Sequence, residues 1–366
     1  MHAAREIAGE LGLDLLVLTP GSDLRYLCGY SAHAMERLTA LTVPARGEPF
    51  LVVPRLEAPM VAASPAGGLG LEVLAWDETD DACALLAGEA TARLGRAPAR
   101  VAVGSRTWAE HALGVQRALP GSALELAGPV VDRLRMVKTA AEIEELAAAG
   151  SAIDRVHARM GEWLRVGRTE AEVGADIAAA ILAEGHVGVD FTIVGSGPNG
   201  ASPHHDVSER IVEAGDLVVV DIGGETATGY RSDCTRTYAV GTAPGAEVAE
   251  WYGVLQEAQQ AATAAVRPGV SAEEIDAVAR RVITDAGWAE HFIHRTGHGI
   301  GLDTHEAPYI VAGNGQPLVP GMAFSVEPGI YLPGRCGARI EDIVVCTDSG
   351  VRTLNEATRE LVELPG

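Results

Sequence analysis

Basic residues are scarce in this 366-residue chain, which has 28 Lys and Arg against 50 Asp and Glu and a formal net charge of -22. Affinity for nucleic acid comes largely from Lys and Arg side chains that neutralise phosphates, so this balance argues against a nucleic-acid partner. The same excess of negative charge argues against binding to an anionic membrane. A well-solvated acidic surface is the simplest interpretation.

Aromatic residues make up only 4% of the chain while 47% of its residues are apolar, so the core must consist mainly of Ala, Val, Leu and Ile. The five cysteines are odd in number and contain no Cys-x-x-Cys pair, which fits a reducing compartment better than a disulfide framework. No stretch supplies the ~20 apolar residues of a membrane span. Gly12 and Asp14 interrupt the first apolar stretch, which is not typical of a signal peptide. We therefore expect a cytoplasmic protein.

Residues 1–130 alternate short β-rich runs with helical stretches. Strands are expected at 15–18, 38–43, 50–53 and 101–103, and helices at 82–94 and 107–119. This alternation predicts an α/β domain. The region has no dense cluster of His and carboxylate residues, so we assign it no chemistry of its own. A change of pattern near Gly128–Pro129 marks the start of a second domain, residues 131–366.

The second domain contains the same order of elements twice. Capping-box patterns at Thr169 and Ser271 each open a helix that ends at a glycine and is followed by strand-like runs. A long helical stretch precedes each one, at 139–164 and at 244–266. We interpret this order as a diverged internal duplication. It predicts two similar halves related by a pseudo-twofold axis, and a site between halves is a natural place for a metal centre.

Four segments of the second domain supply candidate site residues. They read VVVDIGG around Asp221, YRSDCTRT around Asp233, GHGIGLDTHE around His298, and SVEPG and RIED around Glu327 and Glu341. Twelve positions separate Asp221 from Asp233, a spacing that a β-hairpin can bring side by side. Taken singly, each acid fits a strand end or the surface, and His298 fits a turn.

The apolar surroundings of three of these acids favour a functional role. Asp221, Glu327 and Glu341 follow or interrupt apolar strand-like runs, where a carboxylate is costly unless it is paired or bound to metal. Carboxylates gathered in one place would repel one another, and two divalent cations would neutralise them. A donor set of carboxylates with one imidazole suits Mn, Co, Fe or Zn.

Two other motifs do not fit their usual functions. GSGPNG at 195–200 matches the G-x-G-x-x-G pattern of dinucleotide sites, but Pro203 follows closely and no helix is expected there. His305 and Glu306 do not form a zinc-protease motif, because Tyr309 stands where H-E-x-x-H requires its second histidine.

These motifs resemble those of the Xaa-Pro dipeptidases (prolidases) and aminopeptidases P, which are relatives of methionine aminopeptidase with the pita-bread fold. The resemblance covers residues 135–366 through the aspartate pair, GHGIGLDTHE, SVEPG and RIED. Residues 1–130 fit the family's creatinase-type N-terminal domain more loosely. The resemblance implies an α/β creatinase-like domain followed by an α+β pita-bread domain with internal pseudo-twofold symmetry. It also implies a homodimer that hydrolyses Xaa-Pro bonds in proline-containing peptides.

The resemblance also implies a cofactor and its ligands. Two divalent metal ions are expected, with manganese first and cobalt, zinc or iron as alternatives. The implied ligands are Asp221, Asp233, His298, Glu327 and Glu341. Glu327 would in addition move a proton from water to the leaving nitrogen.

Three histidines match the family's accessory histidines, and we treat His204, His294 and His305 as catalytic candidates. His204 and His305 would hydrogen-bond the oxyanion or the carboxylate of the substrate's proline. Arg339 matches the arginine beside the last glutamate and has two open roles: it binds that carboxylate, or it orients Glu341 or Asp342.

Binding of the carboxylate by Arg339 would favour a dipeptidase over an aminopeptidase P. Another two-metal aminopeptidase and a non-catalytic binding homologue are the remaining alternatives. We read His205, the neighbour of His204, as facing solvent.

Overall fold

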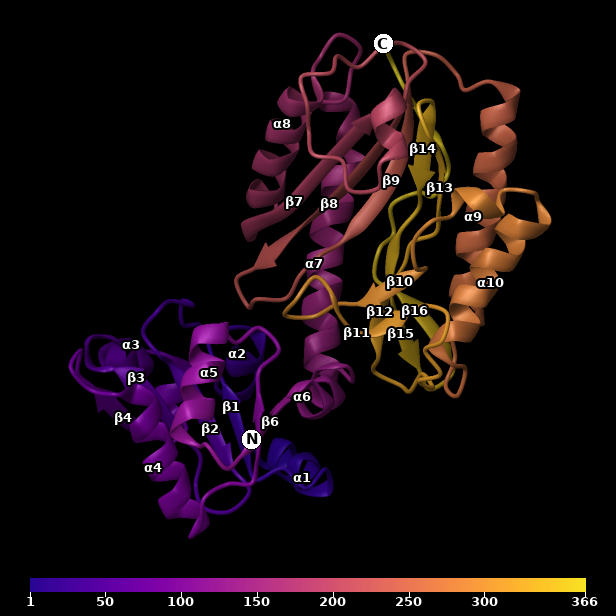
Figure 1. Cartoon of the computed structure of the whole chain (residues 1–366). Coiled ribbons are helices and arrows are strands. Elements are labelled where there is room, and N and C mark those ends of the chain that lie inside the picture. The colour runs from indigo at the N-terminus through magenta and orange to yellow at the C-terminus, as the bar shows by residue number, and fades with distance from the viewer. The chain divides into compact units, whose positions relative to one another are not determined.

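A computed structural model describes all 366 residues, and its internal contacts divide the chain into two units, Met1–Arg135 and Met136–Gly366 (Figure 1). Helix α6 (Gly128–Arg135) spans the boundary expected at residue 130. Its buried residues Val130 and Val131 pack in the core of the first unit, so the whole helix belongs there. None of the helices combines the length and apolarity needed to cross a bilayer.

The first unit is an α/β domain with a six-stranded sheet in the order β4-β3-β2-β1-β5-β6. Its strands are β1 (Leu15–Leu18), β2 (Ala40–Pro44), β3 (Phe50–Pro54), β4 (Glu72–Trp76), β5 (Arg100–Val103) and β6 (Ala123–Leu126). Its other helices are α1 (His2–Glu10), α2 (Ser22–Cys28), α3 (Ala58–Ala63), α4 (Ala82–Leu94) and α5 (Ala109–Ala118). Alternate residues of β1 enter two separate cores, which explains its unbroken apolar sequence.

The second unit contains two sheets in the orders β17-β9-β8-β7 and β11-β10-β12-β15-β16. The first half comprises α7 (Ala140–Ala158), α8 (Glu170–Ala183), β7 (His186–Ser196), β8 (Leu217–Thr226) and β9 (Cys234–Val240). The second half comprises α9 (Ala246–Ala265), α10 (Ala272–Asp285), β10 (Gly297–Gly299), β11 (Glu306–Ile310), β12 (Ala323–Val326), β15 (Asp342–Thr347) and β16 (Gly350–Thr353). The strands β13 (Gly329–Leu332) and β14 (Cys336–Arg339) form a separate two-stranded sheet, and β17 (Val362–Leu364) pairs with β9.

The two halves repeat one local geometry where their second helices begin. The capping boxes at Thr169 and Ser271 both form, with the expected glutamate three residues later in each helix. Thr169 makes an isolated β-bridge to Ile211, and Ser271 makes the corresponding bridge to Pro317. The expected α+β domain with two similar halves is therefore confirmed.

The period-two alternation of the central strands determines which side chains are available for chemistry. In β8, Val220 and Ile222 pack in the core under α7 and α8, so Asp221 between them points to the opposite face. In β12, Phe324 and Val326 pack in the core with α9 and α10, which directs Ser325 and Glu327 away from those helices. Figure 1 shows the helices of each half on one side of its sheet. The polar side chains of the central strands therefore point to the side that the helices leave uncovered.

Candidate metal centre

The first half contributes two aspartates through the hairpin of β8 and β9. These strands pair antiparallel with Asp221 opposite Thr235, so Asp233, two residues before Thr235, lies on the same face as Asp221. A side chain at Gly223 would clash with the carbonyl oxygen of Ser232, so glycine permits the close approach of the two strands. The hairpin expected from the spacing of the two aspartates is confirmed.

The second half contributes a histidine and two glutamates. His298 stands in the middle of β10, and a side chain at the preceding Gly297 would clash with the carbonyl oxygen of Ser325 on the neighbouring strand. The pairing of β12 with β15 places Val326 opposite Asp342. Glu327 and Glu341 directly adjoin that pair, so the two carboxylates leave neighbouring strands at the same level.

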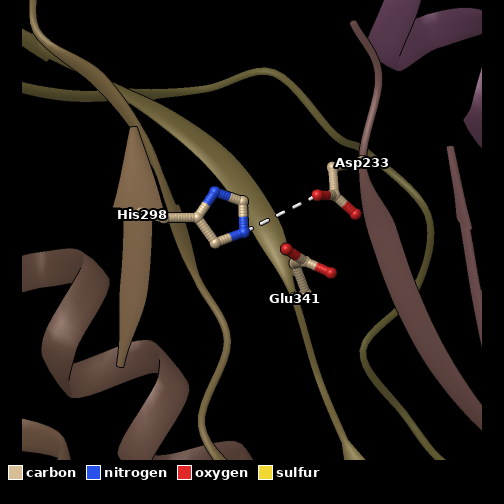
Figure 2. A group of neighbouring side chains, drawn as sticks. All are labelled: Asp233, His298 and Glu341. Atoms are coloured by element: carbon tan, nitrogen blue, oxygen red, sulfur yellow. Dashed lines mark ion pairs between the residues drawn. The ribbon is translucent and has the colours of Figure 1, made fainter. Parts of the chain in front are cut away.

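Three of these side chains form a buried group from segments far apart in the sequence. Potential ligand atoms of Asp233, His298 and Glu341 all lie within 4.8 Å of one another, and each residue is at most 3% exposed (Figure 2). His298 Nε2 lies 3.7 Å from Asp233 Oδ2 and 3.2 Å from Glu327 Oε1. His298 Nδ1 lies 3.1 Å from the Gly299 carbonyl oxygen and therefore carries the proton. Nε2 then directs a lone pair at carboxylates, an arrangement that a bound cation would stabilise.

The electrostatics of the group also call for positive charge. Burial, reinforced by Glu341 and Asp221, raises the pKa of Asp233 well above its usual value. Burial and the charge of Glu327 do the same to the pKa of Glu341. Burial raises the pKa of Glu327 to about 7, with Asp221 adding to the shift. Since Asp221 perturbs all three carboxyl groups, it belongs to the same cluster.

Three of the four carboxylates are held by a neighbour in a way that fits a metal ligand. Thr235 Oγ1 donates to Glu341 Oε2 at 2.8 Å, and Ser325 Oγ donates to Glu327 Oε1 at 3.0 Å. Asp221 Oδ2 accepts from Arg339, whereas Asp221 Oδ1 is buried with no hydrogen-bond partner. A buried carboxylate oxygen without a partner is costly. A divalent cation would satisfy it, so the residues fit the expected metals.

Arg339 is enclosed by protein groups and is 2% exposed. Its Nη2 lies 2.5 Å from Asp221 Oδ2, and its Nε donates to Thr235 Oγ1 at 3.0 Å. Its Nη1 donates to the Tyr331 hydroxyl at 2.9 Å. The guanidinium therefore contacts Asp221 directly and reaches Glu341 through Thr235, instead of pairing with Glu341 or Asp342.

The accessory histidines surround this group in different states. His294 is half-buried, with Nδ1 donating to the Arg295 carbonyl oxygen at 2.8 Å and Nε2 2.9 Å from the Tyr331 hydroxyl. Burial lowers the pKa of His294 to about 3, so it is neutral at physiological pH. His305 is exposed, and its ring centroid lies 3.9 Å from that of His298.

His204 is exposed. It is among the groups that lower the pKa of His294, so the two histidines lie near each other. The preceding residue, Pro203, accepts a hydrogen bond from Arg339 Nη1 at 3.3 Å. The reading of His205 as facing solvent is wrong. Its side chain is 17% exposed, and its Nε2 lies 2.8 Å from a carboxylate oxygen of the buried Glu170.

Two residues near the centre were missed from the sequence. Tyr331 lies within the apolar strand β13, where nothing distinguishes it from a core residue. Arg295 is half-buried, with its guanidinium 4.6 Å above the Tyr309 ring and its Nη2 3.4 Å from His305 Nδ1. Its charge lowers the pKa of both Glu327 and His298, so it acts on the centre. Its position between the histidines of HRTGH is a signal that could have identified it.

Neither GSGPNG nor His305-Glu306 forms the local structure that its usual function requires. The 195–200 motif enters a 3-10 helix, η4 (Gly197–Ala201), and opens no α-helix. His305 precedes strand β11, which begins at Glu306. The Glu306 carboxylate forms a buried ion pair with Lys138 at 2.8 Å.

Comparisons with known proteins agree with this geometry. A probable dipeptidase PepE from Mycobacterium tuberculosis is 55% identical over 362 residues, which cover 99% of this chain and 95% of that protein. An Xaa-Pro dipeptidase from Lactobacillus helveticus is 36% identical, over 96% of this chain and 95% of that protein. The crystal structure of dipeptidase PepE from Mycobacterium ulcerans matches with a TM-score of 0.95 and 56% identity, over 100% of this chain and 96% of that one.

Family profiles assign both units. Residues 1–137 match the creatinase/prolidase N-terminal domain, and residues 144–348 match metallopeptidase family M24. The expected creatinase-like domain and pita-bread domain are confirmed. The chain therefore belongs to metallopeptidase family M24.

Proposed function

We propose that this metallopeptidase is an Xaa-Pro dipeptidase that holds two divalent ions with Asp221, Asp233, His298, Glu327 and Glu341. The observation that carries the proposal is the buried group of Asp233, His298 and Glu341, together with the raised pKa values of its carboxyl groups. Relatives named as dipeptidases and Xaa-Pro dipeptidases support the substrate class.

Metal ions held by these residues would supply Lewis acidity that activates water and polarises the scissile carbonyl. Glu327 is placed to handle the proton, because it is half-buried and its Oε1 lies 3.2 Å from His298 Nε2. A carboxylate beside the attacking water can accept its proton and pass it to the leaving nitrogen. Ser325 Oγ keeps the Glu327 carboxylate oriented during that transfer.

The accessory groups divide into those that face the substrate and those that support the ligands. His204 and His305 are exposed beside the centre and would donate hydrogen bonds to the substrate's oxyanion or proline carboxylate. His294 and Arg339 make their contacts within the protein, and we assign both to orientation. Arg339 would hold Asp221 directly and Glu341 through Thr235.

The positive charge that a dipeptide requires is offered by Arg295. A dipeptide carries its free carboxylate on the proline, close to the scissile bond, whereas a longer peptide has a neutral amide there. Arg295 is half-buried beside His305, and Tyr309 supports its guanidinium. We assign to Arg295 and His305 the recognition of that carboxylate, which favours a dipeptidase over an aminopeptidase P.

The native metal, the assembly and the compartment form a second part of the proposal. Carboxylate oxygens dominate the donor set, which favours manganese over softer metals. Five free cysteines suit the reducing cytoplasm. The family resemblance supports a homodimer, which analytical ultracentrifugation of the purified protein would test.

The test is a substrate profile of the purified protein loaded with Mn²⁺. We expect cleavage of Leu-Pro and other Xaa-Pro dipeptides, loss of activity in a chelator, and recovery when Mn²⁺ returns. Preferential cleavage of Leu-Pro-Yaa peptides would indicate that the protein is an aminopeptidase P. Cleavage of Met-Ala would indicate another aminopeptidase, and failure to bind stoichiometric metal would leave a binding homologue.

A further inference from the structure

A buried carboxylate outside the metal centre gathers an unusual number of hydrogen bonds. Glu170, the first residue of α8, is completely buried. Its Oε1 accepts from Ser196 at the backbone nitrogen (2.7 Å) and at Oγ (2.6 Å), and its Oε2 accepts from Ser208 Oγ at 2.5 Å. Asn199 Nδ2 donates at 3.1 Å, and His205 Nε2 donates at 2.8 Å. One side chain thus binds the last residue of β7 and three residues of the connection that leads from it to β8.

These contacts keep Glu170 charged despite its burial. Burial alone would raise the pKa of Glu170, but the hydrogen bonds from Ser196, Ser208 and His205 outweigh it and hold the pKa below its usual value. A charged acceptor makes hydrogen bonds roughly twice as strong as a neutral one does. The carboxylate is therefore a strong anchor for the chain that surrounds it.

The anchored connection, residues 196–208, starts at the last residue of β7, and beyond that residue it has only the short 3-10 helix η4 as regular structure. Its shape therefore depends on side-chain contacts more than on a backbone ladder. The connection contains His204, next to the anchored His205. Its Pro203 carbonyl oxygen accepts from Arg339, which pairs with Asp221. Contacts on both sides thus fix the position of His204, one to Glu170 and one to the metal centre.

The second half of the same unit contains a matching anchor. Asp276 of α10 is 1% exposed and accepts from Thr296 at the backbone nitrogen (3.0 Å) and at Oγ1 (2.7 Å). Thr296 immediately precedes Gly297 and His298. In each half, a buried carboxylate on a helix accepts hydrogen bonds from the backbone nitrogen and the hydroxyl group of one residue. That residue lies on a segment that leads to the candidate metal centre. The repetition indicates a device for holding site segments.

We propose that Glu170 is a positioning residue that fixes the 196–208 connection and thereby holds His204 in the place where it meets substrate. The inference rests on the proposed function, because the assigned role of His204 is to bind the peptide. Glu170 would act only through the connection, so replacing Glu170 should lower kcat/KM substantially only while His204 is present.

The test combines Glu170→Gln with His204→Ala in a double-mutant cycle on the metal-loaded enzyme with Leu-Pro as substrate. Glu172→Gln is the matched control, because Glu172 is an exposed residue of the same helical turn that completes the capping box. We expect Glu170→Gln to lower kcat/KM by roughly ten- to a hundred-fold when His204 is present, and by less than about three-fold when His204 is already alanine. Glu172→Gln should leave kcat/KM within about two-fold of the native value.

Two readouts separate positioning from simple loss of structure. Metal content of Glu170→Gln should equal that of the native enzyme, and hydrogen exchange should rise in peptides from 196–208 but not in α10. Equal losses of activity in both His204 backgrounds, or unchanged exchange in 196–208, would overturn the proposal. If Glu170→Gln does not fold, Ser208→Ala removes one hydrogen bond and keeps the charge, and the same comparisons apply. A native enzyme that is inactive on Leu-Pro would refute the proposed function, while the exchange comparison would still decide the anchor.

Discussion

Arg339 and Asp221 form a buried ion pair in which the guanidinium Nη2 lies 2.5 Å from the carboxylate Oδ2. The pair uses one oxygen of Asp221 and leaves the other, Oδ1, buried without a partner. The Arg339 guanidinium is 2% exposed and also donates to Thr235 and Tyr331, so protein groups enclose it and limit its access to a substrate carboxylate. The pair therefore favours orientation of a metal ligand as the function of Arg339.

Replacing Arg339 with lysine should lower kcat for Leu-Pro and for Leu-Pro-Yaa peptides by the same factor. The reason is that both substrates depend on the same orientation of Asp221. A hydrogen bond to a charged group is worth ~1.5–3 kcal/mol, or about ten- to a hundred-fold in kcat/KM. Steady-state kinetics on both substrates measure the effect. Arg335→Lys is the control, because Arg335 lies just before β14 in an exposed ion pair with Glu247. A rise in KM confined to the dipeptide would instead show that Arg339 binds the substrate's proline carboxylate.

Replacing Asp233 with asparagine, or Glu341 with glutamine, should remove bound metal and abolish activity. Each change keeps the shape of the side chain but removes a charge from a group that is at most 3% exposed. Loss of an outer partner of a metal ligand costs ~10–100-fold, and loss of a ligand itself should cost more. Elemental analysis beside the peptidase assay tests this. Asp348→Asn, at an exposed position beyond β15, should change neither quantity. A variant with full metal and full turnover would show that the ligand assignment is wrong.

The stabilisation that metal provides should increase with pH. In the metal-free protein, burial raises the pKa of Glu327 from 4.5 to about 7, and the pKa values of Asp233 and Glu341 also rise. Through these groups the folded state binds more protons than the unfolded state, so their contribution to stability is greatest below about pH 4.5 and is lost as the pH rises through 7. Cations take the place of those protons.

The difference in Tm between Mn²⁺-loaded and metal-free protein should therefore grow from pH 5 to pH 7. Thermal unfolding of both forms in matched buffers at each pH measures it. Glu327→Gln should flatten part of the trend, because glutamine has no proton to exchange for metal. A Tm difference that stays constant across this range would contradict the raised pKa values.

The parts of the fold that followed from sequence were those with strong local signals. The capping boxes at Thr169 and Ser271 and the apolar run before Asp221 gave the correct helix starts and the correct β-hairpin. The edge strand β4, with its partly exposed residues, was missed because it lacks a clean apolar pattern. The expected boundary at residue 130 divides helix α6, because the change of pattern near Gly128–Pro129 falls at the start of the helix, whereas its packing assigns it to the first unit.

The site was predictable where residue types and motif spacing carried the information. The structure brings together Asp233, His298 and Glu341 as the motifs led us to expect. The environment of each supporting residue depends on tertiary contacts that no local pattern encodes. Glu170 reads as an ordinary first-turn acid, but it is buried by a connection that begins about 25 residues later. Arg339 could be assigned two roles from sequence, and its burial against Asp221, which no local pattern encodes, favours orientation over substrate binding.

Replacing Arg295 with methionine should raise KM for Xaa-Pro dipeptides and leave KM for Xaa-Pro-Yaa peptides nearly unchanged. Methionine keeps an apolar stem against Tyr309 but removes the charge next to His305. If the guanidinium pairs with the proline carboxylate, its loss should cost about ten-fold or more in kcat/KM for Leu-Pro. The charge of Arg295 also lowers the pKa of Glu327, so its loss will shift the pH profile for every substrate.

That general effect cancels in the ratio of kcat/KM between Leu-Pro and Leu-Pro-amide, which differ only in the terminal charge. The native enzyme should prefer the free acid, and Arg295→Met should remove most of that preference at each pH. Arg267→Met is the control, because Arg267 follows α9 at an exposed position. If the preference for Leu-Pro survives in Arg295→Met, the carboxylate is recognised by another group. His305→Ala then becomes the next variant to compare on the same pair of substrates, since His305 is exposed and its ring lies beside that of His298.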